Sequence, residues 1–123
     1  MGVFERLRPG TRRNRPDPSP EDLLRVAVER TAATVVVRVS GEVDLYTTPL
    51  LASALGQAMV GDAEFVLVDL SEVTFMASSG LRVLLDGLER AERRHCELHL
   101  AGSTAAVRRL IEAAGLRGVL PGA

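Results

Sequence analysis

Residues 69–81 read Asp-Leu-Ser-Glu-Val-Thr-Phe-Met-Ala-Ser-Ser-Gly-Leu, and this stretch indicates the fold more directly than any other part of the chain. It begins at the end of an apolar run, residues 65–68, that is typical of a buried strand, and it ends where a leucine-rich helix begins. The first turn of a helix has backbone N–H groups without helical partners, so Ser78 and Ser79 stand at a place suited to a phosphate. The alternative is that these serines only cap the helix, since serine is a preferred N-cap residue.

This stretch resembles the signature of the STAS family, in particular that of the bacterial anti-sigma factor antagonists, which typically reads D-L-S-x-V-x-F-x-D-S-S-G-L. Every fixed position matches except one, where Ala77 stands in place of the usual Asp. Upstream, residues 39–44 (Val-Ser-Gly-Glu-Val-Asp) are similar to the family's second strand and turn, and residues 47–49 to the start of its first helix. Downstream, residues 110–116 and 119–121 are similar to its closing helix and last strand. The resemblance covers residues 22–121.

Composition indicates one small domain. The chain has 123 residues, of which 46% are hydrophobic and 25% charged, enough for one core and too few for two domains. Only 3% are aromatic and Trp is absent, which leaves little for stacking on bases, so we expect no direct contact with nucleic acid. A single Cys argues against a disulfide framework and fits a reducing cytoplasm.

Residues 1–20 differ from the rest of the chain. They contain four of the six prolines and five arginines against Glu5 and Asp17, which predicts a disordered tail ahead of a STAS domain over residues 21–123. The tail has no apolar segment typical of a secretory signal, and no run in the chain approaches membrane-spanning length.

Hydrophobic periodicity predicts the elements of an α/β fold. Alternation over residues 24–28 and 35–39 indicates a hairpin. A helix follows, with Thr48 as N-cap, Pro49 at its first position and Gly61 beyond its end. Residues 65–70 predict a central strand covered on both faces and closed by Asp69, residues 81–91 a second helix, and residues 97–100 a fourth strand. Ser103 would cap a third helix. The result is a small mixed sheet with an N-terminal hairpin and about three packed helices.

Two predicted loops, after the second and third strands, emerge from the carboxyl ends of those strands, the edge at which open sheets bind ligands and partners. If the two strands are neighbours, as in the STAS fold, both loops form one surface. We expect this surface to bind a partner through the following residues: Glu42, Asp44, Leu45, Tyr46, Ser71, Met76, Ala77, Ser78, Ser79, Gly80, Leu81 and Arg82.

Enzymatic patterns fit poorly, so no catalytic residue, metal site or cofactor is expected. An esterase elbow needs Gly two residues before the nucleophile, which neither serine has. The two histidines, His95 and His99, lie beyond the far end of the second helix from the serines, and a strand would send Cys96 to the opposite face from them. A receiver domain, with Asp69 as phosphoryl acceptor, would require a catalytic Lys, and the chain contains no Lys.

The resemblance implies a function. Such a protein binds an anti-sigma factor with a histidine-kinase-like ATPase fold and so releases a sigma factor, and that partner, a serine kinase, phosphorylates the first Ser of the pair, here Ser78. Phosphorylation switches the antagonist off until a phosphatase removes the phosphate. A cytoplasmic protein that is a monomer or weak dimer, with no membrane contact, is expected. Because Ala77 replaces the usual acid, the alternative is a constitutive STAS scaffold without a phospho-switch.

Overall fold

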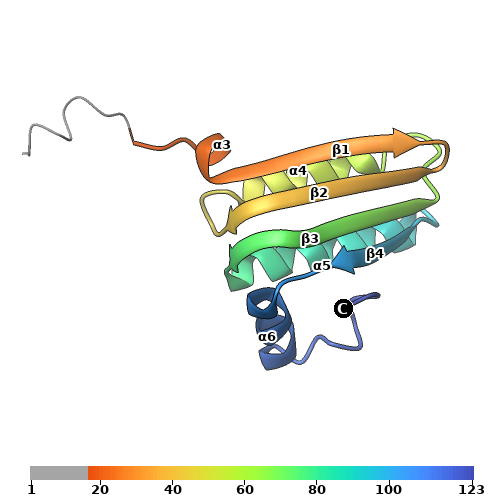
Figure 1. Ribbon diagram of the computed structural model, residues 1–123. Coiled ribbons are helices and arrows are strands. Elements are labelled where there is room, and N and C mark those ends of the chain that lie inside the picture. Colours follow the sequence, from red (N-terminus) through yellow and green to blue (C-terminus); the bar gives the residue numbers. More distant parts are fainter. Residues whose placement is uncertain (1–16) are drawn as a thin grey trace, which may run out of the picture.

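The computed structural model describes residues 17–123, which form a four-stranded mixed sheet in the order β1-β2-β3-β4 with helices packed against it (Figure 1). The predicted fold class is confirmed. The predicted disordered tail falls mostly on residues 1–16, which lie outside the described residues. In chain order the elements are α3 (Pro20–Leu23), β1 (Leu24–Thr31), β2 (Thr34–Val43), α4 (Thr48–Ala58), β3 (Phe65–Met76), α5 (Ser78–Arg93), β4 (Glu97–Gly102) and α6 (Ala105–Ala113).

The N-terminal hairpin forms as predicted. β1 pairs with β2 in antiparallel register from Leu24 opposite Gly41 to Thr31 opposite Thr34. Only Ala32 and Ala33 connect the strands, and Ala32 adopts a positive φ of 54°, as tight hairpin turns require. β2 then runs parallel to β3, and β3 parallel to β4.

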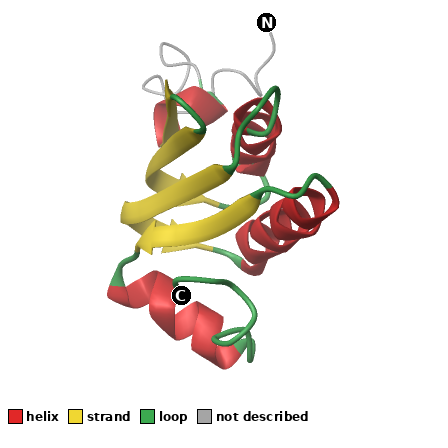
Figure 2. Ribbon diagram, turned by 90° about the vertical axis from the view of Figure 1, so that its right-hand side faces the viewer, coloured by secondary structure: helices red, strands yellow, loops and turns green. Residues whose placement is uncertain are grey.

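The core lies between the sheet and the two crossover helices, α4 and α5, which cover the same face of the sheet (Figure 2). Alternate residues of the three parallel strands point into it and are fully or almost fully buried: Val35, Val37, Val39, Val66, Val68, Leu70, Leu98 and Leu100. Intervening residues face the other side, where Arg38 is exposed and Phe65 is 39% exposed. The prediction that residues 65–70 are covered on both faces is therefore wrong, because the two crossover helices lie on one face.

The third strand is longer than predicted. β3 does not close at Asp69 but continues to Met76, because β2 beside it supplies hydrogen-bond partners up to Val43. Asp69 marks a register shift in the pairing with β4. Its Oδ1 accepts hydrogen bonds from the backbone N of Ser71 at 3.0 Å and from Ser71 Oγ at 2.6 Å. The acid orders an irregularity within the strand instead of a loop after it.

Three further predictions, two cap residues and one strand, are wrong. Thr47, not Thr48, is the N-cap residue of α4, and Thr104, not Ser103, caps α6 by accepting a hydrogen bond from the backbone N of Val107. Residues 119–121 form turns and not a last strand. A single backbone hydrogen bond, from the N of Leu100 to the O of Pro121 at 2.8 Å, ties this segment to β4.

Candidate functional site

The carboxyl ends of β2 and β3 lie side by side. Val43 pairs with Met76, and the backbone N of Ala77 donates a 2.8 Å hydrogen bond to the O of Val43. The loop that follows β2, residues 44–47, is thereby placed next to the first turn of α5, which starts at Ser78. The structure thus brings together the two segments that the sequence predicted to share a surface.

The loop after β2 is held by its own polar groups. Asp44 Oδ1 accepts hydrogen bonds from the backbone N of Tyr46 at 2.9 Å and of Thr47 at 3.1 Å, and lies 3.3 Å from Thr47 Oγ1. The Thr47 hydroxyl is fully buried and donates to the O of Glu42 at 2.8 Å. Asp44 therefore organises the loop, as an Asx turn does, while Glu42 is exposed.

The helix that follows the loop begins without a side-chain cap. Its N-cap residue is Ala77, which has the extended conformation of a cap (φ −88°, ψ 166°) but no acceptor atom. Ser78 and Ser79 are the first two helical residues, so the interpretation of either serine as the N-cap is wrong. No acidic residue occupies the first turn, and Arg82 is exposed one turn further on. The positive end of the α5 dipole is thus uncompensated by a nearby carboxylate of its own helix.

The two serines differ in accessibility. Ser78 is exposed. The Oγ of Ser79, by contrast, is buried and has no hydrogen-bond partner among residues 17–123. Only the first hydroxyl of the pair is therefore open to a reacting group.

A buried floor lies beneath the serines. Met76, Gly80 and Leu81 are all buried, so they support the surface and do not form it. The contact is close at Gly80, where a Cβ would lie 2.8 Å from both Met76 Cγ and Val43 Cγ1. Glycine at this position lets the first turn of α5 approach the ends of β2 and β3.

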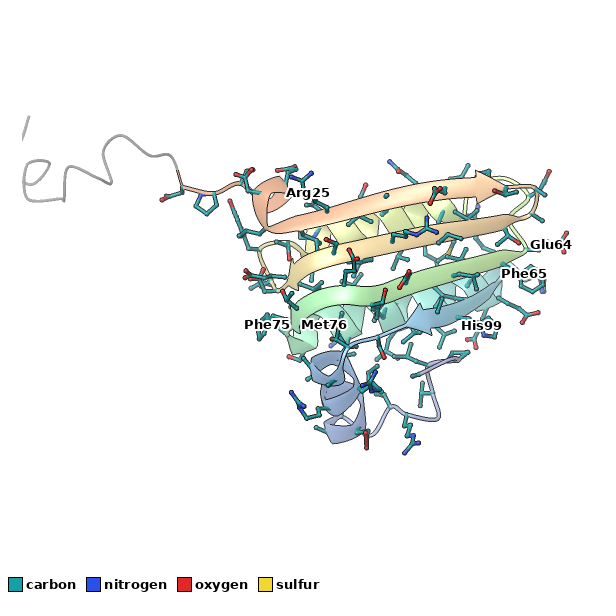
Figure 3. All side chains as sticks on the ribbon, viewed as in Figure 1. Arg25, Glu64, Phe65, Phe75, Met76 and His99 are labelled. Atoms are coloured by element: carbon teal, nitrogen blue, oxygen red, sulfur yellow. The ribbon has the colours of Figure 1, made fainter. Side chains whose placement is uncertain are left out.

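Exposed apolar side chains lie in the loop after β2 and near the end of β3. Leu45 is 80%, Tyr46 51% and Phe75 50% exposed. Phe75 lies opposite Glu42 in the β2–β3 pairing, beside a register shift between Gly41 and Glu42, and Figure 3 shows it with Met76 at this end of the sheet. Sequence reasoning missed Phe75, because an aromatic residue in a strand is normally expected in the core.

Ser71 lies apart from this end surface. It sits midway along β3, beside a hollow of about 160 Å³ whose lining includes Arg38, Asp69 and Glu72. Its hydrogen bonds, together with the nearby Arg38 guanidinium, hold the pKa of Asp69 below its usual value although partial burial opposes the shift. Ser71 therefore serves the irregularity in β3.

The residues that the sequence analysis weighed as catalytic bases or metal ligands, His95, Cys96 and His99, lie beyond the other end of α5. His95 follows the helix in a left-handed turn (φ 56°), and His99 Nε2 lies 3.2 Å from Glu97 Oε1 in β4. Burial raises the pKa of the Cys96 thiol. Across residues 17–123 no cluster of His, Cys, Asp and Glu is arranged to hold a metal ion, and no helix in that range has the length and apolarity needed to cross a membrane.

Comparisons with known proteins agree on one family. A family model described as Mlab, STAS domain matches residues 26–121. The anti-sigma-B factor antagonist of Listeria monocytogenes is 34% identical over 92 residues, which cover 75% of this chain and 81% of that protein. The anti-sigma-B factor antagonist of Staphylococcus aureus is 31% identical over 84 residues, which cover 68% of this chain and 78% of that protein. The crystal structure of an anti-sigma factor antagonist from Mycobacterium paratuberculosis has a TM-score of 0.73 and 32% identity, covering 85% of this chain and 88% of that one.

Proposed function

Because this chain belongs to the STAS domain family, we propose that it is an anti-sigma factor antagonist: it binds an anti-sigma factor and so releases a sigma factor in the cytoplasm. Similar proteins from Listeria and Mycobacterium are named as such antagonists. The observation that carries the proposal is Ser78, an exposed hydroxyl at the first position of α5, at the end of the sheet where Leu45 and Phe75 are also exposed. Apolar side chains that a soluble domain leaves open at one end are typical of a surface that a partner covers.

The partner we propose is an anti-sigma factor with a histidine-kinase-like ATPase fold that phosphorylates Ser78. A phosphate adds a charge of about −1.5 to −2 and three acceptor oxygens. The uncapped first turn of α5 can accept that charge in the free protein, whereas an interface would desolvate it at a large cost. If the coupling free energy between phosphorylation and partner binding is about 1 to 3 kcal/mol, phosphorylation would weaken the complex roughly 5- to 150-fold. A phosphatase would restore binding.

Ala77 is compatible with this switch. An Asp here would be an N-cap acceptor for the N–H groups of the first turn, and Ala77 leaves those groups to a phosphate or to water. The same substitution is the observation that favours the second candidate, a constitutive STAS scaffold, since the family's usual acid beside the target serine is missing. In either case we expect a monomer or weak dimer that contacts neither nucleic acid nor membrane.

Incubation with a kinase-type anti-sigma factor and ATP, followed by intact-mass measurement, tests the proposal. The wild-type chain and Ser79→Ala should each gain one phosphate, and Ser78→Ala none. Ser79→Ala is the matched control because it removes the adjacent hydroxyl. Binding of the anti-sigma factor without any phosphate on the wild-type chain would support the scaffold, and absence of both binding and phosphate would refute the proposed antagonist.

A further inference from the structure

The outer edge of β1 is open to another chain. β1 is an edge strand of the sheet, eight residues long, without proline and without a register shift in its pairing with β2. At the other edge of the sheet, the O of Pro121 accepts the N–H of Leu100 in β4. Among residues 17–123, no strand pairs with the outer edge of β1, and the O of Pro20 in α3 accepts the N–H of Leu24 at its start. Proteins normally cover or interrupt such an edge, because it can pair with a further strand.

The free backbone groups of this edge belong to alternate residues. In an antiparallel pair, successive residues direct their N–H and C=O groups alternately toward the neighbouring strand and away from it. The two-residue turn of the hairpin places Thr31 and Thr34 in a hydrogen-bonded pair, so the odd-numbered residues of β1 face β2. Val26 and Val28 therefore direct their N–H and C=O groups outward, in phase with the N–H of Leu24.

An apolar groove lies beside this edge on the side of α4. Val26 and Val28 line it together with Leu50 and Ala54 of α4, and its volume is about 400 Å³. Val28 is 36% exposed, and Val26 and Leu50 are only partly buried. Figure 1 shows β1 along the margin of the sheet, with α4 packed behind β1 and β2. A strand that pairs with β1 would thus gain apolar contacts from the groove as well as backbone hydrogen bonds.

The charges of β1 indicate which strand would fit there. Arg25 and Glu29 are four residues apart in one strand, so their side chains lie on the same face of the sheet. Glu29 forms an ion pair with Arg38 on that face. Arg25 is exposed and forms no ion pair with any other of residues 17–123. A complementary antiparallel strand would carry an acid opposite Arg25 and a base opposite Glu29, with an apolar residue on each side of the position between them.

We propose that the strand that pairs with β1 is β1 of a second copy of this chain, in antiparallel register about a two-fold axis at Ala27. In a two-fold interface residue i contacts residue j and j contacts i, so this axis places Arg25 opposite Glu29 of the second copy, and Glu29 opposite its Arg25. Val26 and Val28 face each other in the same way, with their outward backbone groups in hydrogen-bonding positions. Axes at Val26 or Val28 also align the backbone groups but place no unlike charges of β1 opposite each other. One sheet then continues across the two copies.

This pairing uses a different surface from the site around Ser78. No residue of β1 belongs to the loop of residues 44–47 or to the first turn of α5, so the inference does not rest on the proposed function. The paired segment is short and its charged side chains are exposed. We therefore expect a weak dimer, with a dissociation constant on the order of 100 µM.

Sedimentation equilibrium of the full-length chain over a range of concentrations tests the pairing. Arg25→Glu places Glu opposite Glu twice, and Glu29→Arg places Arg opposite Arg twice, so each variant alone should dimerise about tenfold more weakly than the wild type. An equimolar mixture of the two variants should recover the dimer, because every Glu then faces an Arg across the axis. Arg109→Glu makes the same charge change as Arg25→Glu at an exposed residue of α6, and it should dimerise like the wild type.

Cysteine cross-linking tests the register. In the proposed dimer the two copies of Ala27 form a non-hydrogen-bonded pair with Cα atoms about 4.5 Å apart, a distance that a disulfide spans. Ala27→Cys should therefore give a covalent dimer under mild oxidation. Thr31→Cys is the matched control, because Thr31 is also exposed on β1 but lies opposite Leu23 of the second copy. The native Cys96 is buried and is common to both variants.

Three results would overturn the proposal. The first is a wild-type chain that stays monomeric well above the expected dissociation constant, since the edge would then be free or reserved for a different protein. The second is a dimer that neither charge reversal weakens, and the third is equal cross-linking of Ala27→Cys and Thr31→Cys. Circular dichroism should show the same fold in every variant, and the cysteine pair decides the question if a charge reversal prevents folding. Absence of phosphate on Ser78 would count against the proposed function and not against this pairing.

Discussion

Ala77→Asp should stabilise the domain, because it restores a side-chain acceptor to a helix that begins without one. The backbone of Ala77 already has the extended N-cap conformation and is held by its hydrogen bond to Val43, so an Asp can accept a hydrogen bond from the first turn without backbone rearrangement. A capping side chain is worth about 1 kcal/mol, within a range of roughly 0.5 to 2. The negative charge at the helix N-terminus adds about 0.3 to 1 kcal/mol.

Urea unfolding followed by circular dichroism measures the gain, which we expect to be about 1 to 2 kcal/mol at pH 7. A domain of this size should show a melting temperature higher by about 4 to 8 °C per kcal/mol. Ala77→Asn is the matched control, since it supplies the acceptor without the charge. Below about pH 4 the Asp variant should lose most of its advantage while the Asn variant keeps its own. The reasoning is refuted if neither variant is more stable than the wild type at pH 7.

Four other substitutions probe the site. Ser79→Ala should raise the free energy of unfolding by about 0.5 to 1.5 kcal/mol in urea titrations, since it removes a buried hydroxyl without a partner and improves helix propensity; a loss would reveal a hidden hydrogen bond. Gly80→Ala should lower it by about 1 to 3 kcal/mol, because the new Cβ would crowd Met76 and Val43, and unchanged stability would mean that the floor can shift. Asp69→Asn should destabilise the folded domain at pH 7. Because folding lowers the pKa of the Asp69 carboxyl, the stability that this carboxylate contributes is present above about pH 4 and is lost as the pH falls through the lower folded-state pKa. The wild type and the variant should therefore converge in stability in acid. Ser78→Asp should weaken binding to the anti-sigma partner in calorimetric titration while circular dichroism shows an intact fold, and equal affinity of wild type, this variant and phosphoprotein would remove the switch.

The local features of the fold follow from the sequence by itself. The alternation around Val26 and Val37 predicts the hairpin, and the leucine stripe of residues 81–91 predicts α5, because side-chain periodicity is imposed by the backbone of each element. The Ser-Ser-Gly step also identifies the start of that helix to within one or two residues. Resemblance over residues 22–121 identified the family, which the match over residues 26–121 confirms.

Other features required the tertiary structure, because they depend on partners distant in sequence. β3 extends to Met76 since β2 lies beside it, and the register shift in that pairing accompanies an outward-facing Phe75, which no periodicity rule could predict. Burial separates Ser78 from Ser79 and assigns Met76 and Leu81 to the floor of the site, although all four belong to one contiguous motif. The hydrogen bond between Tyr46 and Pro18 joins the segment before α3 to the loop after β2, a contact between residues far apart in the sequence. Sequence patterns report the period of a segment, whereas exposure and pairing are decided by the segments that pack against it.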